Sequence, residues 1–459
     1  TLPIQRHVAT ALWVFPSVER ACAAIPELVE SGASALELMD SRSLRVAQTF
    51  DGVPRVIAAI PVVDHAALLV EYQDEDEDAL AAKVARGQQI AASIGVEPTF
   101  TTDPHIRAAM WSVRKGLYAT VAGARRVGVT ALLEDVVVPV DRLAASVAEL
   151  SDLLGEFGYD DAVIFGHAKD GNLHFMVTDD FDAPEGKQRL RDFTEAMTAL
   201  VLKNGGSLKA EHGTGIAMAP FVERQYGSEL YDVMVQVKEA ADPAGILNPG
   251  VIITGDPAAH LRDIKTTPSV NPLIDRCVEC GYCEPVCPSK QLTLTPRMRI
   301  VAEREVALAQ HRGDDDLARM LTTAFRYAGL ETCAVDGMCI TTCPLDINTG
   351  DLVREQRALV TPPLAQGVWE VAARHWTLVS QGAGLALSAA KTLPPRLVEG
   401  ATRVLRRVVG PDHMPLWTPD LPGGGTSRKK VAREYLRSRP RRSVGGEDAA
   451  AHYQPSCLK

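Results

Sequence analysis

The sequence predicts an α+β protein in which a sheet-containing region comes first, a cysteine-rich helical region second and a basic region last. Strand-like and helix-like hydrophobic patterns alternate over residues 1–250, and seven of the nine cysteines lie between Cys277 and Cys343. The formal charge changes from −18 over residues 1–360 to +8 over residues 361–459. The overall charge of −10 argues against nucleic acid as a main partner.

In the first region, short apolar runs predict strands and longer amphipathic runs predict helices. The expected strands are Val8–Phe15, Ala35–Met39, Ala66–Tyr72, Val136–Val138, Ala162–Gly166 and Leu173–Val177. The expected helices are Ser17–Glu30, a helix opening with the acidic run Asp74–Asp78, one near Asp141–Phe157 and one near Lys187–Lys203. We interpret the acidic run as a favourable helix start, because carboxylates stabilise the positive end of the helix dipole.

The first cysteine group has the spacing C-x2-C-x2-C-x3-C-P that ferredoxins use for iron–sulfur clusters. It consists of Cys277, Cys280, Cys283, Cys287 and Pro288. Three thiolates two residues apart can surround three corners of one cluster, and the fourth cysteine can reach a second cluster. The gaps are poor geometry for disulfides, and a zinc knuckle would need paired C-x2-C units separated by a long gap. The group therefore indicates reduced, metal-binding cysteines in an intracellular protein.

The second cysteine group has the same frame, with Asp336 at the place of the second cysteine. Its thiols belong to Cys333, Cys339 and Cys343. Exchange of the last cysteine between the groups, as in two-cluster ferredoxins, gives two ligand sets. These are Cys277, Cys280, Cys283 and Cys343 for one [4Fe–4S] cluster, and Cys287, Cys333, Cys339 and Asp336 for the other. If Asp336 is an oxygen ligand, the second cluster is [4Fe–4S]; without this ligand it would be [3Fe–4S]. The alternative for Asp336 is a side chain that only faces solvent. Helices are expected at about Pro296–Gln310 and Asp315–Ala328.

Two histidine motifs predict a second kind of site. The turn Asp170-Gly171-Asn172 predicts a hairpin that returns His174 to the same side as His167. Glu211 and His212 are adjacent further along the chain. Two imidazoles and one carboxylate can hold Zn²⁺ or Mn²⁺ with positions open for substrate, and a neighbouring histidine can act as a general base. Paired hairpin histidines that merely pack together are the alternative.

These histidine motifs, followed by Asn248-Pro249-Gly250, resemble the C-terminal domain of FAD-linked oxidases. That family comprises vanillyl-alcohol-oxidase-type flavoproteins, among them D-lactate, glycolate and D-2-hydroxyglutarate dehydrogenases. The resemblance covers about residues 1–252 and implies a ferredoxin-like α+β sheet. It implies that His167, His174 and Glu211 ligate a divalent metal, Zn or Mn. It also implies that His212 removes the substrate's hydroxyl proton while hydride passes to the flavin.

The resemblance assigns two further residues and a substrate size. Arg114 stands where the family has a carboxylate-binding arginine, with an ordinary surface arginine as the alternative, and Asn248 is the candidate flavin contact. Leu133 stands where hydroxyglutarate enzymes have a lysine, and Met176 where they have an asparagine. Both differences favour a small monocarboxylate such as D-lactate or glycolate.

The resemblance also implies a domain plan. Residues 1–252 form the substrate and metal domain, residues 265–355 a helical iron–sulfur domain of ferredoxin type, and residues 356–459 a helical or linker segment, irregular and basic. The family's FAD-binding domain would precede Thr1, so we expect FAD to be held mainly by a missing N-terminal domain. Tyr453–Cys457 resembles the opening of a cysteine-rich domain that would follow.

The expected function is FAD-dependent oxidation of a small D-2-hydroxy acid, with electrons relayed through the iron–sulfur clusters to a quinone or another electron carrier. The alternative is a non-catalytic iron–sulfur electron-transfer subunit of a respiratory dehydrogenase complex. The expected location is cytoplasmic. The basic run Arg428–Arg442 is interpreted as a solvated or disordered basic linker, with peripheral contact with the inner face of the membrane as the alternative. The apolar stretch Trp376–Ala390 is too short and too polar to span a bilayer.

Overall fold

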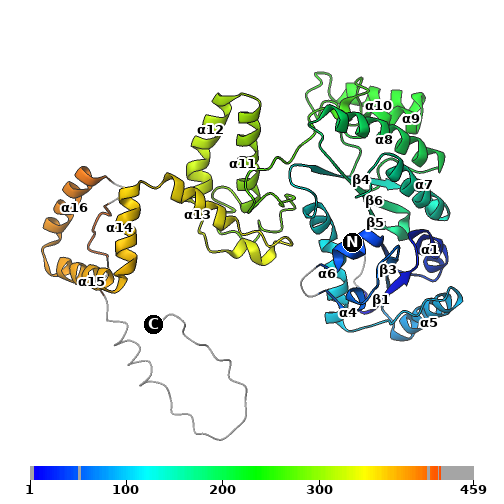
Figure 1. The fold of residues 1–459 in the computed structure, drawn as a ribbon, viewed down its shortest axis with the longest axis horizontal. Coiled ribbons are helices and arrows are strands. Elements are labelled where there is room, and N and C mark those ends of the chain that lie inside the picture. The colour runs from blue at the N-terminus through cyan, green and yellow to red at the C-terminus, as the bar shows by residue number, and fades with distance from the viewer. Residues whose placement is uncertain (1–4, 50–52, 411–413, 422, 425–459) are drawn as a thin grey trace, which may run out of the picture. The chain divides into compact units, whose positions relative to one another are not determined.

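The computed structural model describes residues 5–49, 53–410, 414–421 and 423–424 (Figure 1). The chain divides into two compact units, Thr1–Leu359 and Val360–Lys459. The basic run Arg428–Arg442 and the motif Tyr453–Cys457 lie outside the described residues.

The first unit begins with a six-stranded antiparallel sheet in the order β1-β3-β2-β5-β6-β4. Its strands are β1 His7–Phe15, β2 Ala35–Met39, β3 Ala66–Asp74, β4 Thr130–Val137, β5 Val163–His167 and β6 Asn172–Asp179. Five of the six lie where apolar runs predicted strands, and β4 shares only Val136 and Val137 with its predicted run; the α+β class is confirmed. The fourth is longer than predicted, because β4 pairs with β6 from Thr130 to Val137.

The sheet contains a duplication that the sequence did not reveal. Apart from two short helices between β2 and β3, α3 Ser41–Ala47 and α4 Arg55–Ala58, the order strand, helix, strand, strand, helix occurs twice, first from β1 to α5 and then from β4 to α8. In each half the third strand lies between the other two, and β2 and β5 join the halves. The helices of the two halves are α1 Val18–Ala23, α2 Ile25–Glu30, α5 Glu77–Ser93, α7 Leu143–Glu156 and α8 Pro184–Lys203.

The structure divides one predicted helix into two and confirms the predicted start of another. The single helix expected over Ser17–Glu30 is two helices, α1 and α2, which are separated at Ala24. Pro26 lacks the N–H that a continuous helix would use, so the chain starts a new helix there. The acidic run does lie at a helix start, because the Asp76 carboxylate accepts the N–H of Ala79 at 2.8 Å.

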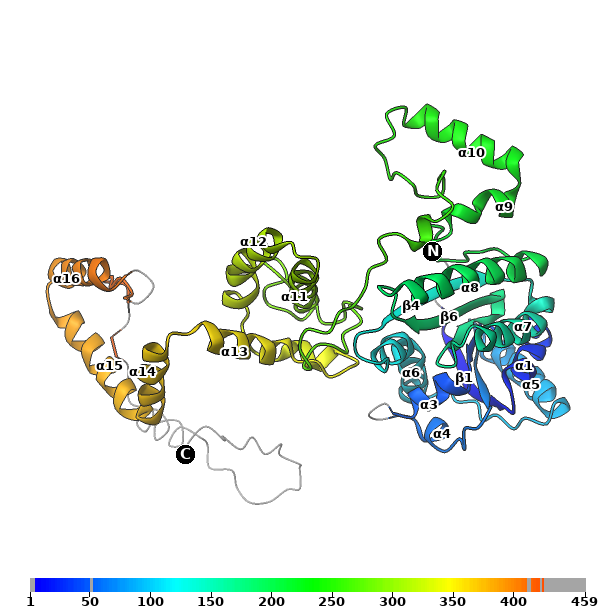
Figure 2. The ribbon, with the colours of Figure 1, turned by 45° about the horizontal axis from the view of Figure 1, so that its top comes forward.

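Helices cover both faces of the sheet (Figure 2). One face packs with α1, α2, α5, α7 and α8 around a large apolar core. The other face packs with α3 Ser41–Ala47, α4 Arg55–Ala58 and α6 Pro104–Gly123 around a smaller core. The sequence analysis did not predict α6, although Asp103 and Pro104 form a standard helix start, with the Asp103 carboxylate accepting two backbone N–H groups.

The cysteine-rich part of the first unit is built on three helices. These are α11 Pro296–His311, α12 Asp315–Phe325 and α13 Thr349–Val360. The prediction for α11 is confirmed to within one residue, whereas α12 ends at Phe325 and continues as a π-helical turn, Arg326–Glu331. Two small apolar cores lie beside the cysteines, one around Ile274 and Ile300 and one around Phe325 and Val353.

The second unit is helical where the structure describes it. Its helices are α14 Pro363–Arg374, α15 Trp376–Thr392 and α16 Pro395–Val409. Of the predicted helical or linker segment, irregular and basic, this part is helical rather than irregular, and Pro363 and Pro395 occupy first helical positions, where proline is well tolerated. Among the described residues, no helix has both the length and the apolar character needed to cross a bilayer.

Candidate active site and cluster-binding sites

The β5–β6 hairpin places two histidines on one face of the sheet. The strands are joined by a 3-10 turn, Ala168–Asp170, and by Gly171 in a left-handed conformation with φ of +74°. A Cβ atom on Gly171 would lie 1.9 Å from the carbonyl oxygen of Val138, so only glycine fits this turn. The rings of His167 and His174 are consequently 5.4 Å apart.

The register of the strands explains why acidic residues meet these histidines. His174 lies directly opposite Asp135 on β4, and His167 lies opposite Glu37 on β2. His174 also pairs with Phe165, two residues before His167 and therefore on the same face. One face of the sheet thus presents two histidines, each with its own carboxylate neighbour.

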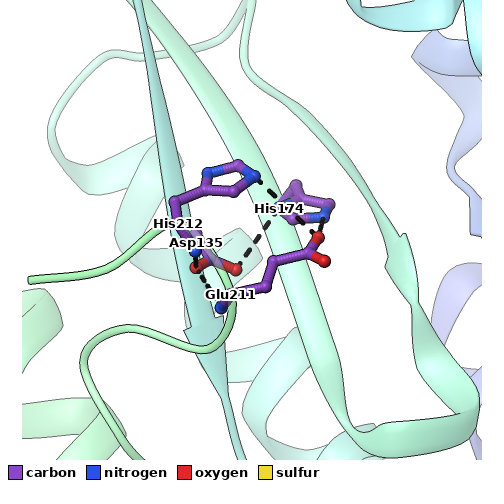
Figure 3. A group of neighbouring side chains, drawn as sticks. All are labelled: Asp135, His174, Glu211 and His212. Carbon is purple, nitrogen blue, oxygen red and sulfur yellow. Dashed lines mark hydrogen bonds and ion pairs between the residues drawn. The ribbon is translucent and has the colours of Figure 1, made fainter. Parts of the chain in front are cut away.

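Three imidazoles converge on one oxygen of Glu211. The distance from Glu211 Oε1 is 3.0 Å to His174 Nε2, 3.2 Å to His167 Nε2 and 3.9 Å to His212 Nε2. Figure 3 shows the part of this cluster formed by Asp135, His174, Glu211 and His212, each of which offers a ligand atom within 4.8 Å of the others. The structure therefore brings together the three predicted metal ligands and the predicted base.

The other nitrogen of each ligand histidine faces a carboxylate. Asp135 Oδ1 is 3.5 Å from His174 Nδ1, and Glu37 Oε1 is 2.8 Å from His167 Nδ1. A carboxylate hydrogen-bonded to Nδ1, as Glu37 is to His167, keeps the proton there and leaves Nε2 free to bind a metal, whereas Nδ1 of His174 has no hydrogen-bond partner among the described residues. Burial lowers the pKa of His174 to about 4, so its ring is neutral, whereas the hydrogen bond to Glu37 raises the pKa of His167. The donor set and its surroundings fit a borderline divalent cation.

Asp135 holds the Glu211 loop in place, a role that the sequence analysis missed. Its fully buried carboxylate accepts the backbone N–H groups of Ala210, Glu211 and His212 at 3.0, 2.8 and 2.9 Å. Asn172 adds a side-chain hydrogen bond of 2.6 Å. Burial opposes the charge of Asp135, but these hydrogen bonds outweigh it and lower the pKa. The one available signal was the acidic pair Glu134-Asp135 within a strand that is mostly apolar.

We expect the substitution Asp135→Asn to release the Glu211 loop and to lower the affinity for divalent metal. An amide cannot accept all of the N–H groups that the carboxylate binds, and each buried donor left without a partner costs about 1–3 kcal/mol. The measurements are chemical denaturation and metal content after dialysis. Glu134→Gln is the matched control, because this neighbour instead pairs with Lys209 at 2.6 Å. Equal metal retention in Asp135→Asn and wild type would contradict the prediction.

Arg114 is a buried side chain on α6, so the alternative of a surface arginine is wrong. Its Nη2 lies 2.9 Å from Glu37 Oε2, and its Cζ lies 5.1 Å from the centre of the Phe165 ring. Burial lowers the pKa of Arg114, and Glu37 opposes that effect. The buried Nε has no hydrogen-bond partner among the described residues. The guanidinium lies beside the histidine cluster through its ion pair with Glu37, and its role as a carboxylate binder stays a prediction.

Asn248 does not belong to the histidine cluster. It lies on an exposed loop after α10, Ser228–Ala241, with a left-handed φ of +44°. A cavity of about 500 Å³ near this loop is lined by Lys209, Gly250 and His260, among others, and includes none of the predicted metal ligands. The role of Asn248 toward flavin therefore stays a prediction.

The cysteines gather around two separate pockets. The first pocket is lined by Cys277, Cys280, Cys283 and Cys343. The second is lined by Cys287, Cys333, Asp336 and Cys339. These are the two crossed ligand sets expected from the spacing. Burial raises the pKa of Cys283 to about 12, so this thiol would ionise only with a cation such as iron beside it.

Asp336 lies at the mouth of the second pocket. The residue is exposed, and its Oδ1 accepts the N–H of Met338 at 3.2 Å. It also lines the pocket together with the three cysteines. This position is compatible with both interpretations of Asp336, as an oxygen ligand and as a solvent-facing carboxylate.

Helix α6 connects the two kinds of site. Arg125, just beyond its end, donates to the carbonyl oxygens of Asp275 and Cys277, both at 3.2 Å. Gly123 lies against Leu345, and a Cβ atom at this glycine would be 2.4 Å from the leucine. The helix that carries Arg114 therefore ends against the loop of the first cysteine pocket.

Together, an antiparallel sheet with a histidine–carboxylate cluster and a helical part with two cysteine pockets define a redox protein. Residues 4–252 match the family described as FAD linked oxidases, C-terminal domain, and residues 273–347 match the 4Fe-4S dicluster domain. The chain belongs to the FAD-linked oxidase family. This membership confirms the expected fold class and the expected classes of cofactor, FAD and iron–sulfur clusters.

Several curated proteins are similar to this chain. The glycolate oxidase subunit GlcD of Bacillus subtilis is 27% identical over 256 residues, which cover 54% of this chain and 51% of the relative. The D-lactate dehydrogenase of Anaerostipes hadrus is 26% identical, covering 55% and 53%. The D-2-hydroxyglutarate dehydrogenase of Escherichia coli is 28% identical over 350 residues, covering 66% and 33%. The chain spans about half the length of the first two.

Proposed function

We propose that the protein oxidises a small D-2-hydroxy acid of the D-lactate or glycolate type and passes the electrons through iron–sulfur clusters to a quinone or another electron carrier. One observation carries the proposal: Nε2 of His167 and Nε2 of His174 converge within 3.2 Å of Glu211 Oε1, on the face of the sheet where Arg114 is buried. The names of the glycolate and D-lactate relatives support the same reaction class.

The proposed roles follow from the side chains present. When bound, FAD accepts hydride from the substrate carbon, and a divalent ion lowers the pKa of the substrate hydroxyl. His167, His174 and Glu211 would hold that ion. Glu37 orients His167 through the hydrogen bond at Nδ1, and Asp135 is a neighbouring carboxylate 3.5 Å from Nδ1 of His174.

Arg114 and His212 would act on the substrate itself. The Arg114 guanidinium can bind the substrate carboxylate and fix its orientation. The His212 ring stacks on His174 with 4.9 Å between ring centres, and its side chain is 42% exposed. It is therefore placed beside the metal ligands and open to an incoming ligand, as a general base for the hydroxyl proton must be.

The apolar side chains next to the predicted metal ligands support a short substrate. Leu133 pairs with Met176 directly beside the Asp135–His174 pair, and both are apolar members of the smaller core. A second carboxylate would find no cation in these two side chains. D-2-hydroxyglutarate is the second candidate, because the Escherichia coli hydroxyglutarate enzyme aligns with 66% of this chain.

The substrate test uses the full-length protein purified without oxygen. We would measure reduction of a dye acceptor with D-lactate, glycolate and D-2-hydroxyglutarate at matched concentrations, and metal analysis would separate zinc and manganese from iron. The proposal expects the highest kcat/KM with D-lactate or glycolate and one zinc or manganese ion for each chain. Preference for D-2-hydroxyglutarate would favour the second candidate, and no activity with any 2-hydroxy acid would favour the electron-transfer subunit.

We further propose that the second unit contacts anionic membrane lipid, close to a quinone acceptor. Helices α14, α15 and α16 bury no side chain among their residues, and α16 exposes Leu397 and Val408 together with arginines. Apolar and basic side chains on one helix are typical of helices that bind at a membrane surface.

We expect the triple substitution Arg396→Gln, Arg403→Gln and Arg407→Gln to weaken binding to phosphatidylserine-containing vesicles by on the order of 100-fold. Each basic residue near an anionic surface contributes about 1 kcal/mol. Co-sedimentation of the full-length protein with vesicles at low and high salt measures this. The same change at three exposed arginines of the first unit, Arg20, Arg55 and Arg312, is the control. Equal losses in both variants would show a non-specific charge effect instead.

A further inference from the structure

Arg299 is an arginine buried beside the second cysteine pocket. The residue belongs to α11 and is 1% exposed. Its Nη1 lies 3.9 Å from Cys287 Sγ, and its Nη2 donates to Ser289 Oγ at 2.9 Å. No carboxylate of the described residues forms an ion pair with it. A guanidinium buried without an anion is strongly unfavourable, so this position calls for a negative group in the pocket.

The surrounding fold fixes the direction of the Arg299 side chain. Its Nε donates to the carbonyl oxygen of Gly329 at 2.7 Å. Gly329 lies in the π-helical turn Arg326–Glu331, where a Cβ atom would be 2.3 Å from the Phe325 ring. Ser289 in turn donates to Leu294 O at 2.8 Å. π-Helical turns often occur at functional sites, and this one supplies the acceptor that holds the guanidinium against Cys287.

The first cysteine pocket has a different charge arrangement. Two arginines beside it form ion pairs with acidic residues of the same cysteine loop. Arg304 lies 2.7 Å from Glu279 Oε1, and Arg297 lies 3.0 Å from Glu284 Oε1. Lys265 also pairs with Glu279. Arg297 and Arg304 are therefore each paired with a carboxylate, whereas Arg125 donates to backbone carbonyl oxygens of this loop; among the described residues, no hydrogen bond joins any of these three side chains to a cysteine sulfur, in contrast to Arg299.

We propose that Arg299 supplies an uncompensated positive charge to the second iron–sulfur site and makes it the more easily reduced of the two. One-electron reduction adds one negative charge to a cluster, and a buried guanidinium at a ligand sulfur stabilises that charge. Arg357 donates to the carbonyl oxygen of Cys333 in the same loop, whereas Arg354 is paired with Asp351. This inference rests on the proposed cluster ligands, and it is independent of the substrate.

The test is a redox titration with dithionite, followed by electron paramagnetic resonance, on the full-length protein purified without oxygen. Cys339→Ala identifies the signal of the second cluster. In wild type we expect the second cluster to have the more positive midpoint potential. Arg299→Gln should lower that midpoint potential by at least about 59 mV, which is a tenfold change in the equilibrium constant for one-electron reduction. The midpoint potential of the first cluster should stay unchanged.

Two further variants separate charge from structure. Arg299→Lys keeps the charge but not the geometry of the guanidinium, so it should retain most of the wild-type midpoint. Arg297→Gln, at the first pocket, should leave the midpoint of the second cluster unchanged. If Arg299→Gln loses the cluster, Arg299→Lys and Ser289→Ala still test the idea, because Ser289→Ala loosens the guanidinium and should shift the midpoint less but in the same direction.

Three results would overturn the inference. They are a second cluster with the more negative midpoint in wild type, an unchanged midpoint in Arg299→Gln with both clusters present, or equal shifts in Arg299→Lys and Arg299→Gln. A negative substrate screen would leave the inference standing, whereas loss of the first cluster's signal in Cys339→Ala would refute the cluster ligands on which it rests.

Discussion

Replacement of His212 by alanine is expected to slow flavin reduction by the substrate by about 10²–10⁴-fold in the full-length protein, which is the usual contribution of a general base. The loss should appear in kcat rather than only in KM, because the imidazole is needed when the hydroxyl proton leaves. Its backbone N–H is fixed by Asp135 at 2.9 Å, and its ring is stacked on His174. The ring is therefore positioned before a substrate binds.

Anaerobic stopped-flow measurement of flavin absorbance at saturating D-lactate or glycolate tests this expectation. His105→Ala is the control, because His105 is exposed at the first turn of α6 and lies outside the cluster. Metal content must be measured in both variants, since His212 Nε2 is 3.9 Å from the ligand Glu211. Wild-type rates in a metal-replete His212→Ala protein would remove this residue as the base.

Replacement of Cys343 by alanine is expected to remove the first iron–sulfur cluster and about half of the bound iron, as loss of one of two clusters requires. Cys343 is close in sequence to Cys339 but lines the pocket of Cys277, Cys280 and Cys283. Flavin reduction by the substrate should survive, because the histidine cluster is untouched. Turnover with a quinone acceptor should fall sharply.

Iron analysis and paramagnetic resonance of the reduced protein measure this outcome. Cys22→Ala is the matched control, because Cys22 is buried in the core of the sheet, where burial raises the pKa of its thiol to about 12. An arrangement in which each cysteine group binds its own cluster predicts a different result. If Cys343 served the same cluster as Cys333 and Cys339, its removal would abolish the signal of the second cluster and leave the first.

Both experiments concern residues that the sequence could identify, because local spacing constrains their geometry. A cysteine every third residue limits how a short loop can surround a cluster, and Asp170-Gly171-Asn172 can only form a tight hairpin turn. The strands were predictable for the same reason, since an apolar run of five to nine residues is itself the signal.

Other features could not be predicted because they depend on contacts between distant segments. In the sequence, nothing distinguishes Glu37 from other strand residues. Its carboxylate contacts His167 and Arg114 only because β2 pairs with β5. The duplication of the sheet is a property of strand order, which leaves no repeated residues to recognise. The break at Ala24 is different, because its cause, Pro26, is local and visible in the sequence.

The sequence by itself determined the kinds of chemistry: thiolates at cluster spacing, and imidazoles with a carboxylate for a divalent ion. Only the tertiary structure decided how these groups are held and charged. Asp135 anchors the Glu211 loop across 76 residues of sequence, and Arg299 lies beside Cys287 without a carboxylate partner among the described residues. The physical reason is that ligand spacing is a local property of the chain, whereas burial and charge compensation arise only when separate segments pack together.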